Sequence, residues 1–204
     1  MSAASVEALL AHPVIARVAR TLRERPGEQL ALSDPLRRAA VALILRDPGD
    51  ASLEFLMIKR ADFEGDPWSG HVALPGGRHE TGDESLQATA IRETREETAI
   101  DIARHGRIIG QLDELQPRTP MLPKIAIAPY VAVLAGDAAI RVSAEVEAAF
   151  WVPLSALEDA DSWSDVELAV RGEKRIFPAF LHKGYVIWGL TERILTQFRT
   201  LVAR

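Results

Sequence analysis

The chain has 204 residues, of which 48% are hydrophobic and 26% are charged, and its formal charge at pH 7 is −5. This length and composition fit one globular domain with an extension and exclude general disorder. The acidic balance and the lack of a Lys/Arg run argue against a nucleic-acid binder, and the absence of cysteine excludes disulfides, thiolate metal sites and cysteine nucleophiles.

No apolar run approaches the length of a transmembrane helix, and the N-terminus lacks the basic start and apolar block of a secretory signal. We therefore expect a cytoplasmic protein that binds neither membrane nor nucleic acid. If its ligand is an anionic small molecule, something other than net charge must attract it, and a bound divalent cation would serve.

The first half of the chain predicts a helix followed by two strands. Residues 4–25 carry apolar side chains at helical spacing, with Pro13 as a break or restart. Continuous apolar runs at 38–46 and 53–60 flank a turn and predict an antiparallel hairpin. The segment 61–77 is rich in Gly and Pro and is expected to be mostly loop.

The second half alternates strands and helices. Helices are expected over 84–98 and from Thr191 onward. Further strands are expected within residues 71–74, 107–115, 124–135, 148–157 and 184–189. This order predicts one α/β (α+β) domain at 34–204, with a mixed sheet and helices on both faces. The helical extension at 1–33 is expected either to pack on that domain or to form a homodimer contact.

Three glutamates crowd the end of the helix predicted over 84–98. Glu93, Glu96 and Glu97 occupy positions i, i+3 and i+4, so that their carboxylates can converge on one point. Like charges at this spacing cost a few tenths of a kcal/mol per pair, and anions near a helix C-terminus oppose its dipole. A bound Mg²⁺ or Mn²⁺, which prefers oxygen ligands, would turn this cost into attraction.

For the hexapeptide RETREE alone, a solvated face balanced by Arg92 and Arg95 is the commoner outcome. The residues just upstream favour a site instead. The LPGG turn at 74–77 lets the backbone approach a ligand closely, and Asp83 or Ser85 can cap the helix. A short strand, a glycine turn, a loop and an acid-bearing helix thus follow one another.

This constellation resembles the Nudix box, the signature of the Nudix hydrolases. The pattern is a glycine, five residues, a glutamate, seven residues, then Arg-Glu, a hydrophobic residue, any residue, Glu-Glu, any residue, glycine and a hydrophobic residue. The matching positions are Gly77, Arg92, Glu93, Glu96, Glu97 and Ile100.

The match departs from the pattern at three places. Six residues, rather than five, separate Gly77 from Glu84, although Glu84 keeps its seven-residue distance to Arg92. Thr94 stands at the hydrophobic position. Ala99 replaces the late glycine, which indicates that the helix exit needs no positive φ there.

The resemblance implies a Nudix-type α/β/α sandwich that uses Mg²⁺ or Mn²⁺ to hydrolyse a nucleoside diphosphate linked to another group. Carried over by position, the metal ligands are Glu93, Glu96, Glu97 and the Gly77 carbonyl. The resemblance also implies that Arg92 orients these catalytic acids, together with Glu84, and that Gly76 contacts the substrate.

The acceptor of the water proton stays open at this point. The candidates are Glu93, Glu145 and Glu147, and for Glu147 a plain surface position is the preferred interpretation.

Two further stretches resemble the coenzyme A pyrophosphatase branch of the family. The segment 59–77 leads into the box as in that branch, with Arg60 and Gly70 aligning loosely. The segment 185–195 resembles its aromatic strand and helix start. There we expect Thr191 to cap the helix, and Trp188 and Leu190 to pack in the core.

This resemblance implies cleavage of coenzyme A or acyl-CoA into 4′-phosphopantetheine and 3′,5′-ADP. The 3′-phosphate would need a cation, which Arg60, Arg118 or Lys124 could supply unless they are solvated loop charges. The alternatives are a pyrophosphohydrolase for ADP-ribose, a dinucleoside polyphosphate or another nucleoside diphosphate derivative, and a Nudix-fold binding module without catalysis.

Overall fold

The computed structural model describes residues 5–31, 37–49, 52–66, 68–117, 124–136, 138–170 and 172–203. Its helices are α1 (Val6–Ala11), α2 (Pro13–Glu24), α3 (Leu86–Thr98), α4 (Ile102–His105) and α5 (Leu190–Val202), with short 3-10 turns η1 (Leu154–Leu157) and η2 (Ala160–Ser162). Within these described ranges, none of the helices combines the length and the apolar character needed to cross a membrane.

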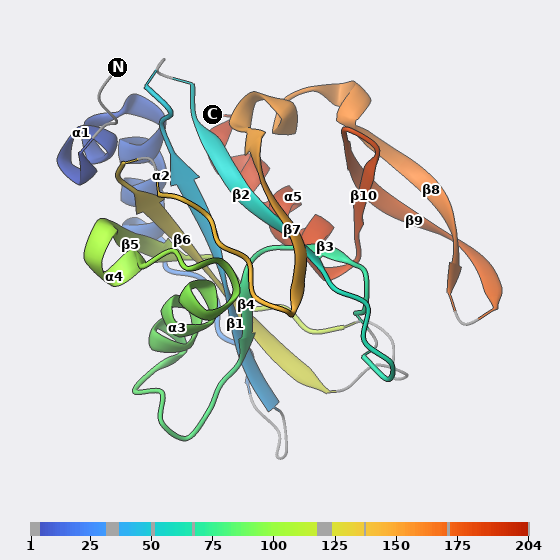
Figure 1. Cartoon of the computed structure of the whole chain (residues 1–204). Coiled ribbons are helices and arrows are strands. Elements are labelled where there is room, and N and C mark those ends of the chain that lie inside the picture. The colour runs from blue at the N-terminus through green and yellow to red at the C-terminus, as the bar shows by residue number, and fades with distance from the viewer. Residues whose placement is uncertain are drawn as a thin grey trace.

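The strands form a large mixed sheet and a small antiparallel one (Figure 1). They are β1 (Arg37–Arg46), β2 (Glu54–Arg60), β3 (Val72–Ala73), β4 (Gly76–Arg78), β5 (Gly106–Gln111), β6 (Ile125–Leu134), β7 (Val146–Pro153), β8 (Trp163–Val170), β9 (Glu173–His182) and β10 (Tyr185–Trp188). The large sheet has the order β3-β2-β1-β6-β5, with β4 on β1 and β7 on β2. Because β1 and β6 run parallel while the other pairs are antiparallel, the predicted mixed sheet is confirmed.

Helices cover both faces of the large sheet, which confirms the α/β/α sandwich. On one face Leu43 and Leu45 of β1 pack with residues of α2 and α5. On the other face Ala40 and Ala42 pack with Ala90 of α3. The small side chains on this second face let α3 lie close to the central strand.

The predicted break at Pro13 is confirmed. His12 caps α2, since its Nδ1 accepts a hydrogen bond from the Val14 N–H at 3.3 Å, and Pro13 occupies the first turn. Ile15 and Leu22 of α2 are buried in the same core cluster as α5, so the N-terminal helices pack on the domain.

The predicted order of strands misses β8 and β9. β8 is exposed or partly buried throughout, β9 begins with four exposed residues, and the hairpin extends away from the body of the molecule (Figure 1). Pro178 lies in β9, the central strand of the small sheet, where proline is uncommon and argues against a strand in the sequence.

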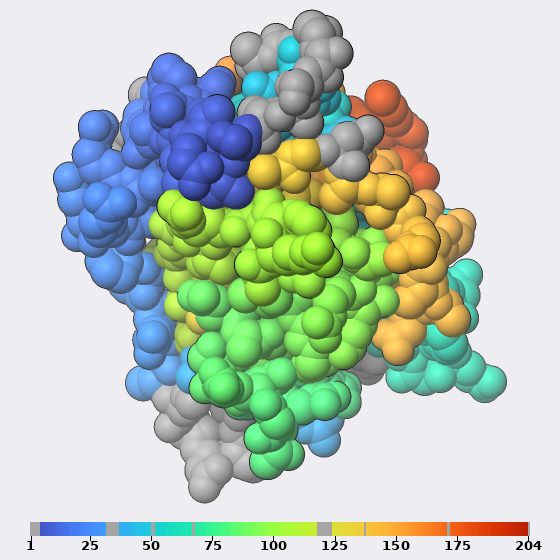
Figure 2. All heavy atoms as spheres, turned by 60° about the vertical axis from the view of Figure 1, so that its left-hand side comes forward, coloured from blue at the N-terminus to red at the C-terminus, as the bar shows by residue number. Residues whose placement is uncertain are grey.

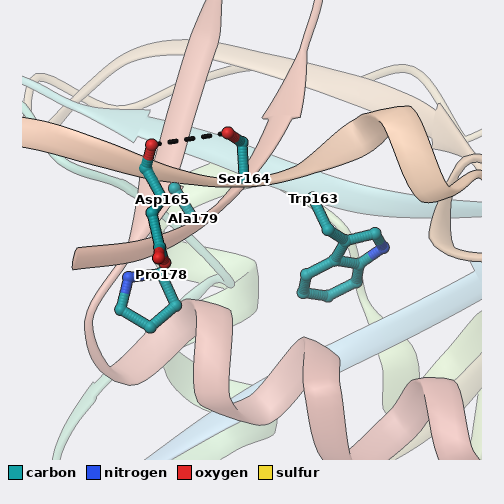
Figure 3. Close-up of a pocket in the computed structure, with 5 residues that line it drawn as sticks. All are labelled: Trp163, Ser164, Asp165, Pro178 and Ala179. Atoms are coloured by element: carbon teal, nitrogen blue, oxygen red, sulfur yellow. Dashed lines mark hydrogen bonds between the residues drawn. The ribbon is translucent and has the colours of Figure 1, made fainter. Parts of the chain in front are cut away.

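The β8–β9 hairpin and the adjoining α5 border an open pocket that lies apart from the glutamate helix. The pocket is lined by Trp163, Ser164, Asp165, Pro178 and Ala179 (Figure 3). The guanidinium of Arg199 on α5 lies 4.9 Å from the centre of the Trp163 ring. Asp165 is the only titratable side chain of the pocket lining.

The predicted cap at Thr191 is wrong. The N-cap of α5 is Gly189, with φ 72°, and Thr191 lies inside the first turn. Leu190 and Trp188 are partly buried: Leu190 packs on the core, and the Trp188 ring lies 4.7 Å from that of His71.

Candidate active site

The glycine turn reaches α3 because β4 takes the place of β2 beside β1. The β1–β2 pairing covers only the register pairs Leu45 with Phe55 and Arg46 with Glu54 near the connecting turn. Further along β1, β4 is the antiparallel partner. Gly76 has φ 151°, and a Cβ there would lie 2.3 Å from the Ala40 carbonyl oxygen, so this close approach requires glycine.

Glu97 points inward from α3 onto this turn. Its side chain is 3% exposed, and its Oε2 accepts a hydrogen bond from the Gly76 N–H at 2.8 Å. Burial raises the pKa of Glu97 to about 7, although the Gly76 N–H and Arg60 oppose the rise. Gly76, predicted as a substrate contact, therefore positions a carboxylate with its amide.

Glu93 lies against the second glycine. A Cβ on Gly77 would fall 2.4 Å from the Glu93 carboxylate, so any other residue there would force this side chain to move away. Burial raises the pKa of Glu93, while Arg92, 3.0 Å away, lowers it. Gly77 thus has a steric reason to be glycine that the sequence does not reveal.

The third glutamate does not join the other two. Glu96 is 54% exposed and accepts a hydrogen bond from Nη1 of Arg92 at 3.0 Å. Among the residues that the structure describes, no three acidic or histidine side chains are grouped closely enough to hold a metal ion as they stand. The expected convergence is therefore not observed, because Arg92 attracts Glu96 while Gly76 holds Glu97.

Arg92 binds Asp83 rather than Glu84. Its Nε and Nη2 donate to the two Asp83 oxygens at 2.8 and 2.9 Å, and Nη2 also donates to the Arg78 carbonyl at 3.0 Å. These bonds hold the pKa of Asp83 well below its usual range, although burial opposes them. Glu84 is exposed.

The signal for Asp83 was present in the sequence. Asp83 keeps the five-residue distance from Gly77, whereas Glu84 keeps the seven-residue distance to Arg92. The extra residue thus lies between the loop acid and the arginine.

The two ends of α3 differ in how well the sequence predicts them. Ser85 is the N-cap, and its Oγ accepts from the Ala88 N–H at 3.1 Å, as expected. The expectation for Ala99 is wrong, since Ala99 is a left-handed C-cap with φ 61°. The helix exit therefore keeps the conformation for which glycine is favoured.

We expect Ala99→Gly to stabilise the protein by about 0.5 to 1 kcal/mol, because glycine adopts this conformation without the steric cost that alanine pays. Ala88→Gly, within the same helix, is the matched control and should destabilise it by a similar amount. Urea unfolding of the three proteins measures both effects. A loss of stability for Ala99→Gly would contradict the assignment of the cap.

Arg60, at the end of β2, lies between the glutamates and the following loop. Its Nη2 donates to Asp66 at 2.8 Å, and its Nη1 lies 3.7 Å from Oε1 of Glu97. The predicted substrate cation is thus next to the acids. Arg118 lies outside the described residues, and Lys124 is an exposed residue just before β6.

The two candidate bases at the start of β7 have different surroundings. Glu147 is 49% exposed and lies 2.7 Å from the ammonium of Lys59, which agrees with a surface position. Glu145 accepts a hydrogen bond from the Ala61 N–H on its carbonyl at 2.9 Å. Burial is the main cause of the raised pKa of both Glu93 and Glu97, and the charge of Glu145 adds a smaller contribution.

The segment that leads into β7 thus borders the acids. It is joined to the end of α3 by the hydrogen bond from the Ser143 N–H to the Glu97 carbonyl at 3.0 Å. In the space-filling view, α3 and this segment lie side by side on one face of the molecule (Figure 2).

The chemistry of these side chains fits a hard divalent cation. All are carboxylates, the oxygen donors that Mg²⁺ and Mn²⁺ prefer. The cradle at Gly77 admits the Glu93 carboxylate, and burial raises the pKa of Glu97, so that a cation bound there would stabilise its charged form. Glu93 and Glu97 are the residues that would hold such an ion.

The raised pKa of Glu97 predicts a pH dependence of stability. Its folded value of about 7 lies above the ordinary 4.5, so the folded state binds the proton more tightly. The resulting stability, on the order of 3 kcal/mol, is present below pH 4.5 and is lost as pH rises through 7. We expect the unfolding free energy of the wild type minus that of Glu97→Gln to fall over this range without metal. A difference that stayed flat or rose would contradict the burial of this carboxylate.

Comparisons with known proteins agree with the fold. The sequence model of the NUDIX domain matches residues 35–170. The uncharacterized Nudix hydrolase NudL of Photorhabdus laumondii is 32% identical over 174 residues, covering 84% of this chain and 88% of that protein. The chloroplastic Nudix hydrolase 22 of Arabidopsis thaliana is 31% identical over 175 residues, or 81% of this chain, which spans only 55% of the plant protein's length.

A solved structure shows the same fold. The MutT/nudix family protein of Enterococcus faecalis superposes with a TM-score of 0.57 at 20% identity, over 93% of this chain and 70% of its own. The chain therefore belongs to the Nudix hydrolase family.

Proposed function

We propose that the protein is a divalent-metal-dependent pyrophosphohydrolase acting on a nucleoside diphosphate derivative. The observation that carries this proposal is the placement of a buried and a partly buried carboxylate, each beside one glycine of the turn: Glu97 on the Gly76 amide and Glu93 in the space left by Gly77. Family membership supports the reaction class.

Each residue then has a defined task. Glu93 and Glu97 would hold Mg²⁺ or Mn²⁺, with Glu96 as a further predicted ligand. A bound ion would neutralise the charge of the pyrophosphate and lower the pKa of a bound water molecule. Arg92 holds Glu93 and Glu96, each at 3.0 Å, and so limits their movement. Arg60, 3.7 Å from Glu97, places a cation where a phosphate would arrive.

Glu145 is our preferred acceptor of the water proton. Its charge is a minor cause, smaller than burial, of the raised pKa of both Glu93 and Glu97, so this exposed acid faces both, whereas Glu147 is engaged by Lys59 at 2.7 Å. Glu145→Gln is expected to lower kcat about 100-fold with little change in KM, because general-base catalysis contributes about 10² to 10⁴ in rate. Glu147→Gln is the matched control. An equal effect of the two substitutions would exclude this role.

Coenzyme A or an acyl-CoA is the proposed substrate, on the resemblance of residues 59–77 and 185–195 to the coenzyme A pyrophosphatase branch. The position of Arg60 beside the acids is compatible with a polyanionic substrate. ADP-ribose or another nucleoside diphosphate derivative is the alternative.

A substrate panel tests the proposal. Purified protein with Mg²⁺ or Mn²⁺ is incubated with coenzyme A, ADP-ribose, NADH and diadenosine polyphosphates, and the products are separated by chromatography. We expect coenzyme A to give 4′-phosphopantetheine and 3′,5′-ADP with the highest kcat/KM. A higher value for another compound would overturn the substrate, and no turnover of any would favour a binding module.

A further inference from the structure

A chain of hydrogen bonds extends the Asp83–Arg92 pair on the side away from the glutamates. Thr89 is fully buried on α3, and its hydroxyl lies 2.8 Å from Oδ2 of Asp83. The Nδ1 atom of His79 lies 2.9 Å from the same hydroxyl. His79 and Thr89 therefore contact the pair that holds the glutamates, although neither touches a glutamate.

The acceptor at the end of this series of hydrogen bonds is Asp83. It is ionised and can only accept, because its hydrogen bonds with Arg92 keep its pKa well below the usual range. The single hydroxyl proton of Thr89 has three acceptors within reach: Asp83 at 2.8 Å, Nδ1 of His79 at 2.9 Å and the Ser85 carbonyl at 3.2 Å. The short bond to the charged acceptor is the stronger one. When the Thr89 hydroxyl donates to Asp83, its oxygen can accept from His79 in the tautomer that carries the proton on Nδ1.

These hydrogen bonds connect Thr89, through Asp83, to the arginine that contacts the glutamates. Oδ2 of Asp83 receives Thr89, Arg92 Nη2 at 2.9 Å and the Glu80 N–H at 3.0 Å. Arg92 in turn contacts Glu93 and Glu96 at 3.0 Å each. Asp83 thus helps to position the Arg92 guanidinium, which in turn contacts Glu93 and Glu96.

Thr89 differs from the other buried threonines of α3. Thr94 and Thr98 are also fully buried, and their hydroxyls donate to helix carbonyls four residues earlier, at 2.7 and 2.6 Å. Such bonds are ordinary for threonine inside a helix. Only Thr89 of these three binds a side chain of the Arg92 network.

We propose that Thr89 and His79 are positioning residues for the acids: they fix Asp83, and through Asp83 and Arg92 they fix Glu93, which would receive the metal, and its neighbour Glu96. The proposal rests on the proposed function, since it assumes that these acids bind a divalent cation. It assigns a role to two residues of the loop and helix that the family pattern leaves variable.

The test is Mn²⁺ binding by isothermal titration calorimetry. Thr89→Val keeps the shape of the side chain and removes the hydroxyl, and Thr89→Ser restores the hydroxyl. Thr94→Val is the matched control, because it makes the same change at an equally buried position of the same helix. We expect Thr89→Val to bind Mn²⁺ about 10-fold more weakly than the wild type, a typical loss when a partner of a metal ligand is removed. Thr89→Ser and Thr94→Val should bind within about twofold of the wild type.

Equal Mn²⁺ affinities of Thr89→Val and Thr94→Val would overturn the proposal, as would failure of Thr89→Ser to restore binding. If Thr89→Val does not fold, as judged by circular dichroism, the more exposed His79 decides the question. His79→Asn keeps a donor near Nδ1 and should bind nearly as the wild type, whereas His79→Phe should bind several-fold more weakly. Equal affinities of these two variants would also overturn the proposal.

The Mg²⁺ concentration for half-maximal hydrolysis gives a second measurement on the same variants. A wild type that binds Mn²⁺ but cleaves no pyrophosphate would refute the proposed function, and the comparison of Mn²⁺ affinities would still decide the role of Thr89.

Discussion

Replacement of Glu97 by glutamine is expected to lower kcat by about 100-fold or more while leaving the protein at least as stable at pH 8. Loss of one carboxylate ligand removes several kcal/mol of charge stabilisation in the transition state, and each 1.4 kcal/mol is a factor of ten in rate. The amide oxygen of glutamine can still accept the Gly76 N–H, which bonds to the carboxylate at 2.8 Å in the wild type. The substitution also removes a buried charge, so the free energy of unfolding should not fall.

The measurement is kcat on the best substrate of the panel, together with urea unfolding at pH 8. Glu147→Gln is the control, because Glu147 is an exposed acid near the same site. Wild-type activity of Glu97→Gln would remove Glu97 from the site. A lost activity accompanied by a large loss of stability would instead show that the carboxylate holds the fold.

Asp83→Asn is expected to destabilise the protein by about 3 kcal/mol, whereas Glu84→Gln should change stability by less than about 0.5 kcal/mol. Asp83 is 6% exposed and takes two hydrogen bonds from Arg92, whose side chain is 20% exposed. Because this pair is partly buried, we place the cost at the low end of the about 3 to 5 kcal/mol that loss of one partner of a buried ion pair brings. Glu84 is exposed, and surface substitutions have small effects. Urea unfolding at pH 7 measures both.

Comparison of the two variants shows whether the extra loop residue lies between Asp83 and Arg92 or between Gly77 and Glu84. Metal affinity should change in the same direction as stability. Asp83→Asn should weaken metal binding, because Arg92 loses its partner, whereas Glu84→Gln should leave it unchanged. A larger effect of Glu84→Gln on stability or on metal affinity would show that the seven-residue spacing identifies the partner of Arg92, against the geometry described above.

Elements with a strong period could be predicted from the sequence. The apolar runs of β1 and β2 and the glutamate helix α3 fall within one or two residues of their expected bounds. The mixed sheet and the layers follow from their order. β8 and β9 could not be predicted, because their partly exposed strands lack a clean alternation and Pro178 reads as a break.

The site was predictable in its residue types but not in its contacts. The spacing of Glu93, Glu96 and Glu97 is local information, so it identified the acid-bearing face. The partners of these acids come from distant segments, and their choice depends on three-dimensional competition. Arg92 attracts Glu96 outward, while the amide of Gly76, which the β4–β1 pairing presents, holds Glu97 inward.

The Ala99 cap shows a different limit. Alanine at this position argues against a left-handed residue, because its Cβ makes that conformation sterically unfavourable. The chain adopts it all the same, with φ 61°, since the Arg141 N–H donates to Thr98 and the Ser143 N–H donates to Glu97 at the end of α3. Tertiary hydrogen bonds of this kind leave no local signal in the sequence.

The most direct test of the central claim is a titration of the protein with Mn²⁺, in which electron paramagnetic resonance measures the free ion. The wild type and Glu147→Gln are predicted to bind Mn²⁺ saturably with equal affinity, whereas Glu93→Gln and Glu97→Gln should bind at least 10-fold more weakly. Absence of saturable binding to the wild type, or wild-type affinity in both Glu93→Gln and Glu97→Gln, would contradict the claim that these two carboxylates form the metal site.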